Sequence, residues 1–343
     1  MARKSPGDSE LWKRMVLRSM PLPAWLGPDA PEGDVVVSSR VRYARNLRGR
    51  RFPHHATEAE LRAISSEIIS CYAASGLALQ VHKRLSGAES EYLIGCRLLS
   101  PEFPIRGPGR TLLLDEDRSI GVMVNEEDHL RIQALTSGWS PSAALRIADL
   151  VLGQGAARLA FAFSEPRGYL TASPYNAGAA RRMSAMFHLI GLAHAKRTIP
   201  VLQALADQGL VARGLFGESS RAVGAFFQVS ATGGSDALFV GACEYLLREE
   251  RTARREVPRK ALDEQARAAV RFAVEARQVT LADALRVLGW ARWASAVGLN
   301  GFPDSYRTVD QWLAILEVRS SADEDATARQ RAEFLRERLE SAV

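Results

Sequence analysis

Short apolar runs bounded by polar residues occur at several places along this chain and predict β-strands. Asp34 to Ser39 and Phe226 to Ser230 are rich in β-branched or aromatic residues, as strands usually are. Thr111 to Leu114 and Ile120 to Val124 flank a five-residue segment of mainly charged residues. That arrangement predicts a β-hairpin with a five-residue loop.

Other segments place their apolar residues at helical spacing. Thr57 and Glu60 have the spacing of a capping box at the start of one predicted helix, which runs to about residue 74. The same periodicity predicts a helix over 141–158 and one or two helices over 181–205. Within the last range, Pro200 marks an interruption or a new start.

The pattern changes after about residue 240, where charge-rich amphipathic segments follow one another. They predict helices over 240–254, 258–277, 281–299 and 323–341, with Thr280 as a cap before the third. Residues 1–33 are polar and proline-containing and are predicted to be a short lead-in. We therefore expect three parts, which are the lead-in over 1–33, a main domain over 34–255 and a C-terminal helical domain over 256–343.

The composition is that of a globular protein in which arginine greatly outnumbers lysine. The net charge is +6, and only five of the 45 basic residues are Lys, so the rest are Arg. The chain lacks a basic block interleaved with aromatic residues, which argues against a nucleic-acid partner. No apolar stretch reaches the ~18 residues of a membrane span. The three Cys are widely spaced without a CxxC, which favours the reducing cytoplasm and argues against a zinc site.

The segment 124–133 is the first candidate site, because three consecutive acids, a His and an Arg follow directly after an apolar run. Glu127 and Arg131 carry opposite charges four residues apart. They could hold a cationic substrate group beside an anionic one, and a guanidinium beside an ATP phosphate is such a pair. An exposed cluster of solvated charges explains this segment alone equally well.

Ser38, Arg40 and Arg42 occupy alternate positions of the first predicted strand, so their side chains point to the same face. Two guanidinium groups and a hydroxyl that converge on one spot would hold a polyphosphate. The alternative is an edge strand with exposed Arg side chains.

Two further segments could contact an anion. Residues 171–180 form a loop of Pro, Asn, Gly and small residues, and they are predicted to run into a helix with Arg182 in its first turn. The N-terminus of such a helix suits an anion. The segment 213–218 adds Arg213 and Glu218 around two glycines. Plain surface turns are the alternative for both segments.

The order of these segments resembles the phosphagen (guanidino) kinase family. The matching stretches are SSRVRYARNL, NEEDHLRIQ, YLTASPYNAG with the following RR, and RGLFGE, within about residues 30–250. A short N-terminal lead-in and a helical C-terminal part resemble, within the family, the bacterial protein-arginine kinases. The resemblance implies an α+β fold, in which a catalytic domain with an antiparallel sheet flanked by helices precedes a C-terminal helical domain.

The resemblance also implies an activity, which is transfer of the γ-phosphoryl group of ATP to the guanidinium of arginine residues in proteins. It implies that the nucleotide is bound by Ser38 and by five arginines, Arg40, Arg42, Arg131, Arg182 and Arg213. Glu127 and Glu218 would hold the acceptor guanidinium, with Glu127 taking its proton. Mg²⁺ would be held mainly by phosphate oxygens and water, so we expect no metal site built from protein ligands.

Several positions depart from the family pattern. Ser173 stands where the family has a Cys that contacts the guanidinium, and a hydroxyl supplies no negative charge near neutral pH. Tyr175 replaces a usual Thr, and Arg97 stands where the bacterial enzymes have His. Thr327 and Ala328 replace the Arg and Asp of a phosphoarginine-binding motif, so we expect no regulation through that motif.

Three functions remain open at this point. The first is a protein-arginine kinase with Ser173 as its third catalytic residue. The second is a regulator or adaptor that keeps the fold, suggested by Ser173 and by an altered segment over 231–236. The third is a kinase for a small guanidino metabolite. Proteins bearing arginine are the expected partners, and a Clp-type protease, an activator protein and a homodimer are implied by the resemblance alone.

Overall fold

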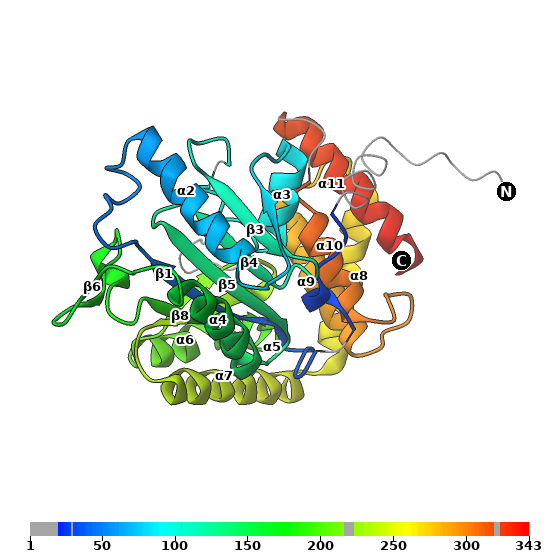
Figure 1. Ribbon diagram of the computed structural model, residues 1–343. Helices are drawn as coiled ribbons and strands as arrows, with labels where there is room; N and C mark the ends of the chain where they lie inside the picture. Colours follow the sequence, from blue (N-terminus) through cyan, green and yellow to red (C-terminus); the bar gives the residue numbers. More distant parts are fainter. Residues whose placement is uncertain (1–19, 29, 104, 216–222, 319–322, 343) are drawn as a thin grey trace.

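The computed structural model describes residues 20–28, 30–103, 105–215, 223–318 and 323–342. An antiparallel sheet forms the centre of this part of the chain, with strand order β2-β3-β4-β5-β1-β8-β10-β9. β1 (Val36–Arg45) lies in the middle, between β5 (Leu130–Ser137) and β8 (Arg181–His188) (Figure 1). The other strands are β2 (Leu79–His82), β3 (Thr111–Asp115), β4 (Ile120–Val124), β9 (Val211–Gly214) and β10 (Phe226–Thr232).

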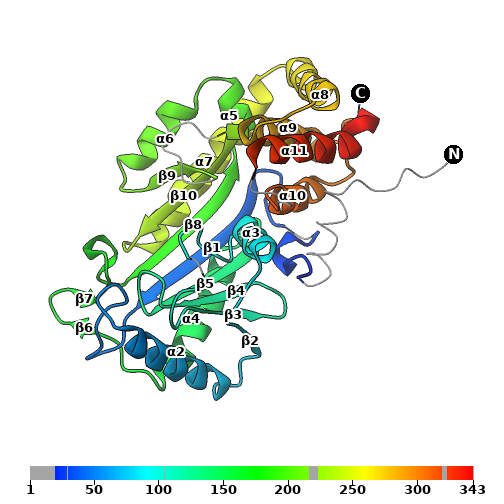
Figure 2. The ribbon, with the colours of Figure 1, turned by 90° about the horizontal axis from the view of Figure 1, so that it is seen from above.

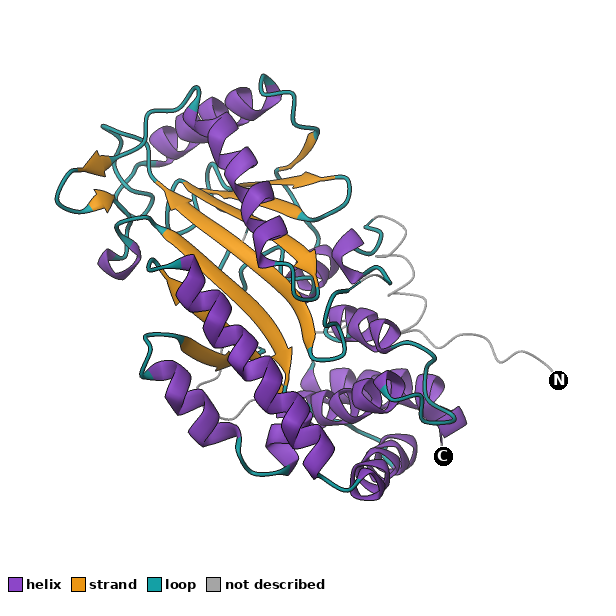
Figure 3. Cartoon of the chain, turned by 90° about the horizontal axis from the view of Figure 1, so that it is seen from below, coloured by secondary structure: helices purple, strands orange, loops and turns teal. Residues whose placement is uncertain are grey.

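Helices pack on both faces of the sheet and bury two apolar cores. One core contains residues of α2 (Glu58–Ala73), α4 (Pro141–Ala156), α6 (Thr198–Ala206) and α7 (Asp236–Glu256), and Figure 3 shows helices laid across this face. The other core contains residues of α3 (Gly87–Gly95), α8 (Arg259–Glu275), α9 (Leu281–Ala296), α10 (Tyr306–Ile315) and α11 (Glu324–Leu339). Figure 2 shows α8 to α11 gathered at one end of the sheet. The predicted α+β class, with an antiparallel sheet flanked by helices and followed by further helices, is confirmed.

A buried ionic cluster ties the C-terminal helices to the segment before β1. Asp310 accepts hydrogen bonds from Arg292 Nε at 2.7 Å and from Arg307 Nη1 at 2.8 Å. The same guanidinium groups donate to the backbone carbonyls of Gly33 at 2.5 Å and Gly27 at 2.8 Å. Because the sheet and these helices also share one apolar core, the division into domains at 255 and 256 stays a prediction.

Several local predictions are confirmed. β3 and β4 pair as the antiparallel hairpin expected from their apolar runs. The Thr57 hydroxyl accepts from the Glu60 amide, and the Glu60 carboxylate accepts from the Thr57 amide, so the capping box begins α2 as predicted. The Thr280 hydroxyl caps α9 through the amide of Asp283.

The prediction of helices over 181–205 is wrong in its first third. Arg181–His188 forms the strand β8, and helix appears only in α5 (Ile190–His194) and α6. β8 lies between β1 and β10, and its residues 183–188 are buried on both faces. Such a strand has no alternation of apolar and polar residues, so periodicity does not separate it from a buried helix. Pro200 lies in the first turn of α6, where it is tolerated because no intrahelical amide donor is needed there.

Candidate active site

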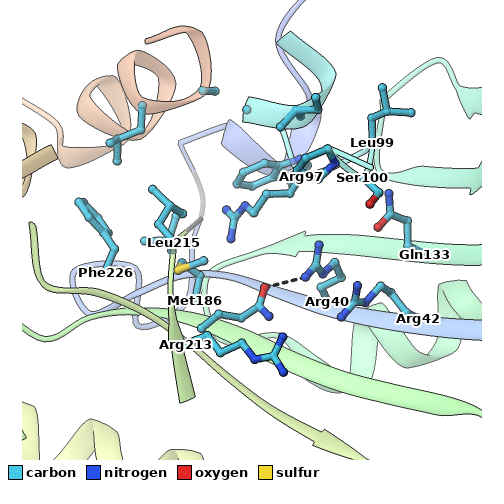
Figure 4. A pocket seen from close by; sticks show the side chains of 18 of the residues that line it. Arg40, Arg42, Arg97, Leu99, Ser100, Gln133, Met186, Arg213, Leu215 and Phe226 are labelled. Carbon is cyan, nitrogen blue, oxygen red and sulfur yellow. Dashed lines mark hydrogen bonds between the residues drawn. The ribbon is translucent and has the colours of Figure 1, made fainter. Parts of the chain in front are cut away.

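Five guanidinium groups from four strands converge on a cavity of about 300 Å³ on the sheet face that carries the C-terminal helices (Figure 4). The five are the arginines that the family resemblance assigned to the nucleotide, Arg40, Arg42, Arg131, Arg182 and Arg213. β5, β1 and β8 are adjacent, and β9 follows after β10. The predicted alternation on β1 is confirmed, since Arg40 and Arg42 both reach this cavity.

The arrangement places like charges opposite one another. Arg42 is the direct cross-strand partner of Arg182 in the β1–β8 ladder. Opposed like charges normally destabilise a sheet. A local conflict of this kind, in an otherwise well-paired sheet, is typical of a functional site.

The arginines of the cavity have few anionic partners among the described residues. Arg40 donates to the Gln228 amide oxygen at 2.6 Å (Figure 4), and Arg182 donates to the Ser230 hydroxyl at 2.6 Å, so both partners are neutral. The Nε atoms of Arg42 and Arg182 are buried without a hydrogen-bond partner in this part of the chain. Donors in this state suit an anion that supplies several acceptor oxygens, as a polyphosphate does.

The electrostatic cost of this cluster appears in the pKa values. Burial, followed by the neighbouring arginines, lowers the pKa of Arg40 well below its ordinary value. Burial, followed by Arg131 and Arg182, lowers the pKa of Arg42 to about 9. Burial and Arg213 lower the pKa of Arg182 in the same direction. All three shifts have the direction expected where like charges are held together away from water, and a bound anion would offset this repulsion.

A sixth arginine in the cavity was assigned no role by the sequence. Arg97 lies over the Trp25 ring, with its Cζ atom 4.6 Å from the ring centroid, and it adopts a left-handed backbone conformation with φ of 60°. Burial lowers its pKa to about 10. Asp310 and Leu313 of α10 line the same cavity, although they follow β1 by more than 260 residues. A pattern read within one segment contains no signal for such long-range contacts.

Arg131 connects the cavity to the acidic segment. It donates to Glu126 at 2.7 Å and to Glu127 at 3.1 Å. Glu127 is 42% exposed at its side chain and does not line the cavity, whereas Glu126 is buried. Burial raises the pKa of Glu127, while Arg131 lowers it. Glu127 and Arg131, which were expected to hold a cationic and an anionic substrate group, are paired with each other here, and Glu126 is a second partner of Arg131.

Asp128 joins the acidic loop to the loop that carries Ser173. Its Oδ1 atom accepts from Asn46 Nδ2 at 2.6 Å and from the backbone amide of Ala172 at 2.7 Å. Because Glu127 precedes Asp128 and Ser173 follows Ala172, the two loops lie side by side. The Ser173 carbonyl accepts from the Thr171 hydroxyl at 2.8 Å, so this residue sits within a hydrogen-bonded turn.

The expected helix N-terminus after Ser173 is absent from the structure. Pro174–Asn176 forms only a single 3₁₀ turn, and the chain then enters β8, so Arg182 lies on a strand. A second, smaller cavity opens beside this turn. Arg42, Arg131 and Arg182 line it together with Asn176 and Ala180, and the same three arginines line the larger cavity. The arginine cluster therefore lies between two openings.

The remaining predicted site residues have different outcomes. Ser38 is buried on β1 and does not line either cavity, so its contact with a nucleotide stays a prediction. Arg213 lies on β9 and not in a loop. Glu218 falls outside the described residues.

Both ring nitrogens of His129 contact backbone groups, which indicates a structural role. Its Nδ1 atom accepts from the Leu47 amide at 3.0 Å, and its Nε2 atom lies 2.9 Å from the Arg51 carbonyl, which fits the neutral tautomer with hydrogen on Nε2. Burial lowers its pKa to about 4. Within the described ranges, no group of three or more His, Cys, Asp or Glu side chains could hold a metal, and no helix is long and apolar enough to cross a membrane.

Comparisons with known proteins identify relatives of this chain. The family model for the ATP:guanido phosphotransferase C-terminal catalytic domain matches residues 63–234. The protein-arginine kinase of Moorella thermoacetica is 38% identical over 213 residues, which cover 60% of this chain and 61% of that protein. The protein-arginine kinase of Halalkalibacterium halodurans is 36% identical over 67% of this chain and 68% of its own length.

A longer match extends into the C-terminal helices. The protein-arginine kinase of Symbiobacterium thermophilum is 32% identical over 323 residues, which cover 89% of this chain and 91% of that protein. Among solved structures, lombricine kinase superposes with a TM-score of 0.55 at 20% identity, over 73% of this chain and 79% of its own. That likeness supports the fold alone. The family match and the extent of these alignments show that the chain belongs to the ATP:guanido phosphotransferase family.

Proposed function

We propose that this protein is a protein-arginine kinase, which transfers the γ-phosphoryl group of ATP to the guanidinium of arginine residues in proteins. The observation that carries the proposal is the cluster of Arg40, Arg42 and Arg182, which have no anionic partner among the described residues. Arg131 lines the same cavity and joins this cluster to Glu127. Family membership and the names of the aligned relatives, which are protein-arginine kinases, support it.

In this proposal the arginines bind the polyphosphate of ATP and neutralise the charge on the group being transferred. Phosphoryl transfer needs little covalent chemistry from the protein, since it depends on positioning and charge neutralisation. Arg42, Arg131 and Arg182 line both cavities, so a phosphoryl group held by them is reachable from the smaller opening. The nucleotide would occupy the larger cavity, and the acceptor would approach from the smaller one.

The acceptor guanidinium would lie between the acidic loop and the turn of Ser173. Glu127 would orient its nitrogen and take the proton as that nitrogen attacks phosphorus. The raised pKa of Glu127 favours proton uptake, because a carboxylate with a higher pKa is a stronger base. The Ser173 hydroxyl would contribute a hydrogen bond, and Glu218 completes the proposed set as a second carboxylate.

Magnesium belongs to the proposal as the ion that accompanies ATP. The described residues hold no acidic cluster for a metal. Phosphate oxygens and water would be its main ligands, and this coordination is common for Mg²⁺ bound with nucleotides. A cytoplasmic location, a homodimer, an activator protein and a Clp-type protease partner remain proposals by family resemblance.

A regulator without catalytic activity is the second candidate, and Ser173 in place of the family Cys is the observation that favours it. A test separates the candidates by incubating the protein with γ-labelled ATP, magnesium and either an unfolded arginine-rich protein or free arginine. Acid-labile label on the protein supports our proposal. Label on free arginine alone would indicate a small-metabolite kinase. No label, with ATP binding retained, would indicate the regulator.

A further inference from the structure

Two exposed aromatic side chains lie on segments that are connected to the lining of the proposed acceptor opening. Tyr175 is 93% exposed and Phe163 is 51% exposed. Tyr175 directly precedes Asn176, which lines the smaller cavity. An aromatic ring offers a large apolar contact area at low entropic cost, which is why exposed aromatic residues often serve in recognition.

Backbone hydrogen bonds join the segments that carry these two rings. Phe163 lies on β6 (Phe163–Ser164), which pairs with β7 (Gly168–Tyr169). The Tyr169 amide donates to the Gly178 carbonyl at 2.8 Å, so β7 is attached to the turn after Tyr175. The Phe163 ring packs edge-on against Tyr169, with centroids 5.3 Å apart.

A buried arginine holds this region in place. Arg45, at the end of β1, donates to the carbonyls of Ala179 at 3.1 Å and Ala180 at 3.3 Å. Its Cζ atom lies 3.7 Å from the centroid of the Tyr169 ring. Arg45 is 2% exposed, so these contacts are shielded from water. The backbone after Tyr175 is therefore held in place by buried contacts, and a preformed backbone lowers the entropic cost of binding.

We propose that Tyr175 and Phe163 form a binding surface for the polypeptide that flanks the acceptor arginine, which makes them specificity-determining residues. The inference rests on the proposed function and names the substrate class of that site. An arginine at the smaller opening would place its neighbouring residues over the turn 174–176. Apolar side chains next to the arginine would then contact the exposed rings, whereas free arginine has no flanking residues to do so.

The test measures binding and turnover of two short peptides, each with one arginine flanked either by leucines or by glycines. Binding is measured by fluorescence anisotropy with labelled peptides, in the presence of ADP and magnesium. Wild type is expected to bind the leucine-flanked peptide about tenfold more tightly. Tyr175→Ala is expected to abolish that preference, and Phe163→Ala to reduce it. Phe272→Ala on α8, which removes another exposed aromatic ring, is the control and should keep it.

The outcomes separate this inference from the proposed function. An unchanged preference in Tyr175→Ala would overturn the inference, even if wild type phosphorylates both peptides. A preference that depends on Tyr175 would support the inference, even if no phosphoarginine forms, and in that case only the kinase proposal would fail. Circular dichroism of each variant checks that the fold is kept.

Discussion

Asp128 accepts a hydrogen bond from the backbone amide of Ala172 at 2.7 Å and thereby attaches the loop of Glu127 to the loop of Ser173. Asp128→Ala should lower the free energy of unfolding by about 1–3 kcal/mol, since it leaves buried donors unpaired. It should also raise the KM for the acceptor while the Kd for ATP stays unchanged.

Asp115→Ala is the matched control for this variant. The Asp115 carboxylate also accepts from a backbone amide, that of Ile120 at 2.7 Å, but it lies at the end of β3, beside the β3–β4 turn. It should lower stability without changing the KM for the acceptor. Equal effects of both variants on this KM would show that Asp128 has no positioning role.

The arginine cavity should favour nucleotide binding at the expense of stability. Arg42 on β1 lies directly opposite Arg182 on the adjacent strand β8. Burial lowers the pKa of Arg42 to about 9. Arg42→Met should therefore raise the free energy of unfolding without nucleotide by about 1–3 kcal/mol, and weaken ATP binding at least about tenfold. Chemical denaturation and titration calorimetry measure the two quantities.

Arg292→Met is the comparison for Arg42→Met, because Arg292 is a fully buried arginine that is paired with Asp310. Its removal leaves a buried carboxylate with one partner fewer, so it should lower stability by about 3–5 kcal/mol. If Arg42→Met also lowers stability, the cavity arginines are satisfied without a nucleotide and the anion-binding account fails.

Ser173→Cys should increase activity toward protein arginine. A thiolate at this position would place a negative charge beside the guanidinium, which the hydroxyl of Ser173 cannot do. We expect kcat/KM for the acceptor to rise about tenfold, a change of about 1.4 kcal/mol. Steady-state kinetics should show the largest gain at alkaline pH, and an unchanged value at every pH would contradict a role for this position.

His129 should make the stability depend on pH. Burial lowers its pKa in the folded protein to about 4, below the ordinary value of 6.5, so the unfolded chain binds a proton first as the pH falls. The contribution is fully present above about pH 6.5 and is lost as the pH falls from about 6.5 to about 4. Between about pH 7.5 and pH 5 the loss from this residue should be about 2 kcal/mol.

Urea denaturation at both pH values measures this effect. His129→Gln keeps a donor and an acceptor on its side chain but does not titrate, so its stability should change less between the two values. An equal pH dependence in both proteins would assign the effect to other groups, of which buried His188 is one, since its pKa is lowered in the same direction.

Local sequence patterns were sufficient for features that depend on neighbours in the chain. The alternation of Arg40 and Arg42 on one strand and the capping box of Thr57 with Glu60 depend on residues two or three positions apart. The family resemblance then joined arginines from separate segments into one site. Each of those five arginines lines the same cavity.

Features that depend on tertiary contacts were not predictable in this way. The sequence pattern predicts a helix where β8 lies, because burial on both faces removes the alternation that marks a strand. Arg97 reaches the cavity through an unusual backbone conformation and a contact with Trp25, more than 70 residues earlier. The wall formed by α10 depends on the packing of the C-terminal helices against the sheet.

The most direct test of the account is phosphorus NMR of wild type and Glu127→Gln with ATP, magnesium and an unfolded arginine-rich protein. Wild type should give an acid-labile N-phosphoarginine signal. The rate should be about 10²–10⁴-fold lower in Glu127→Gln, with ATP affinity retained, because only proton transfer and acceptor positioning are lost. A signal of equal rate from both proteins, or none from a folded wild type that binds ATP, would contradict the proposal.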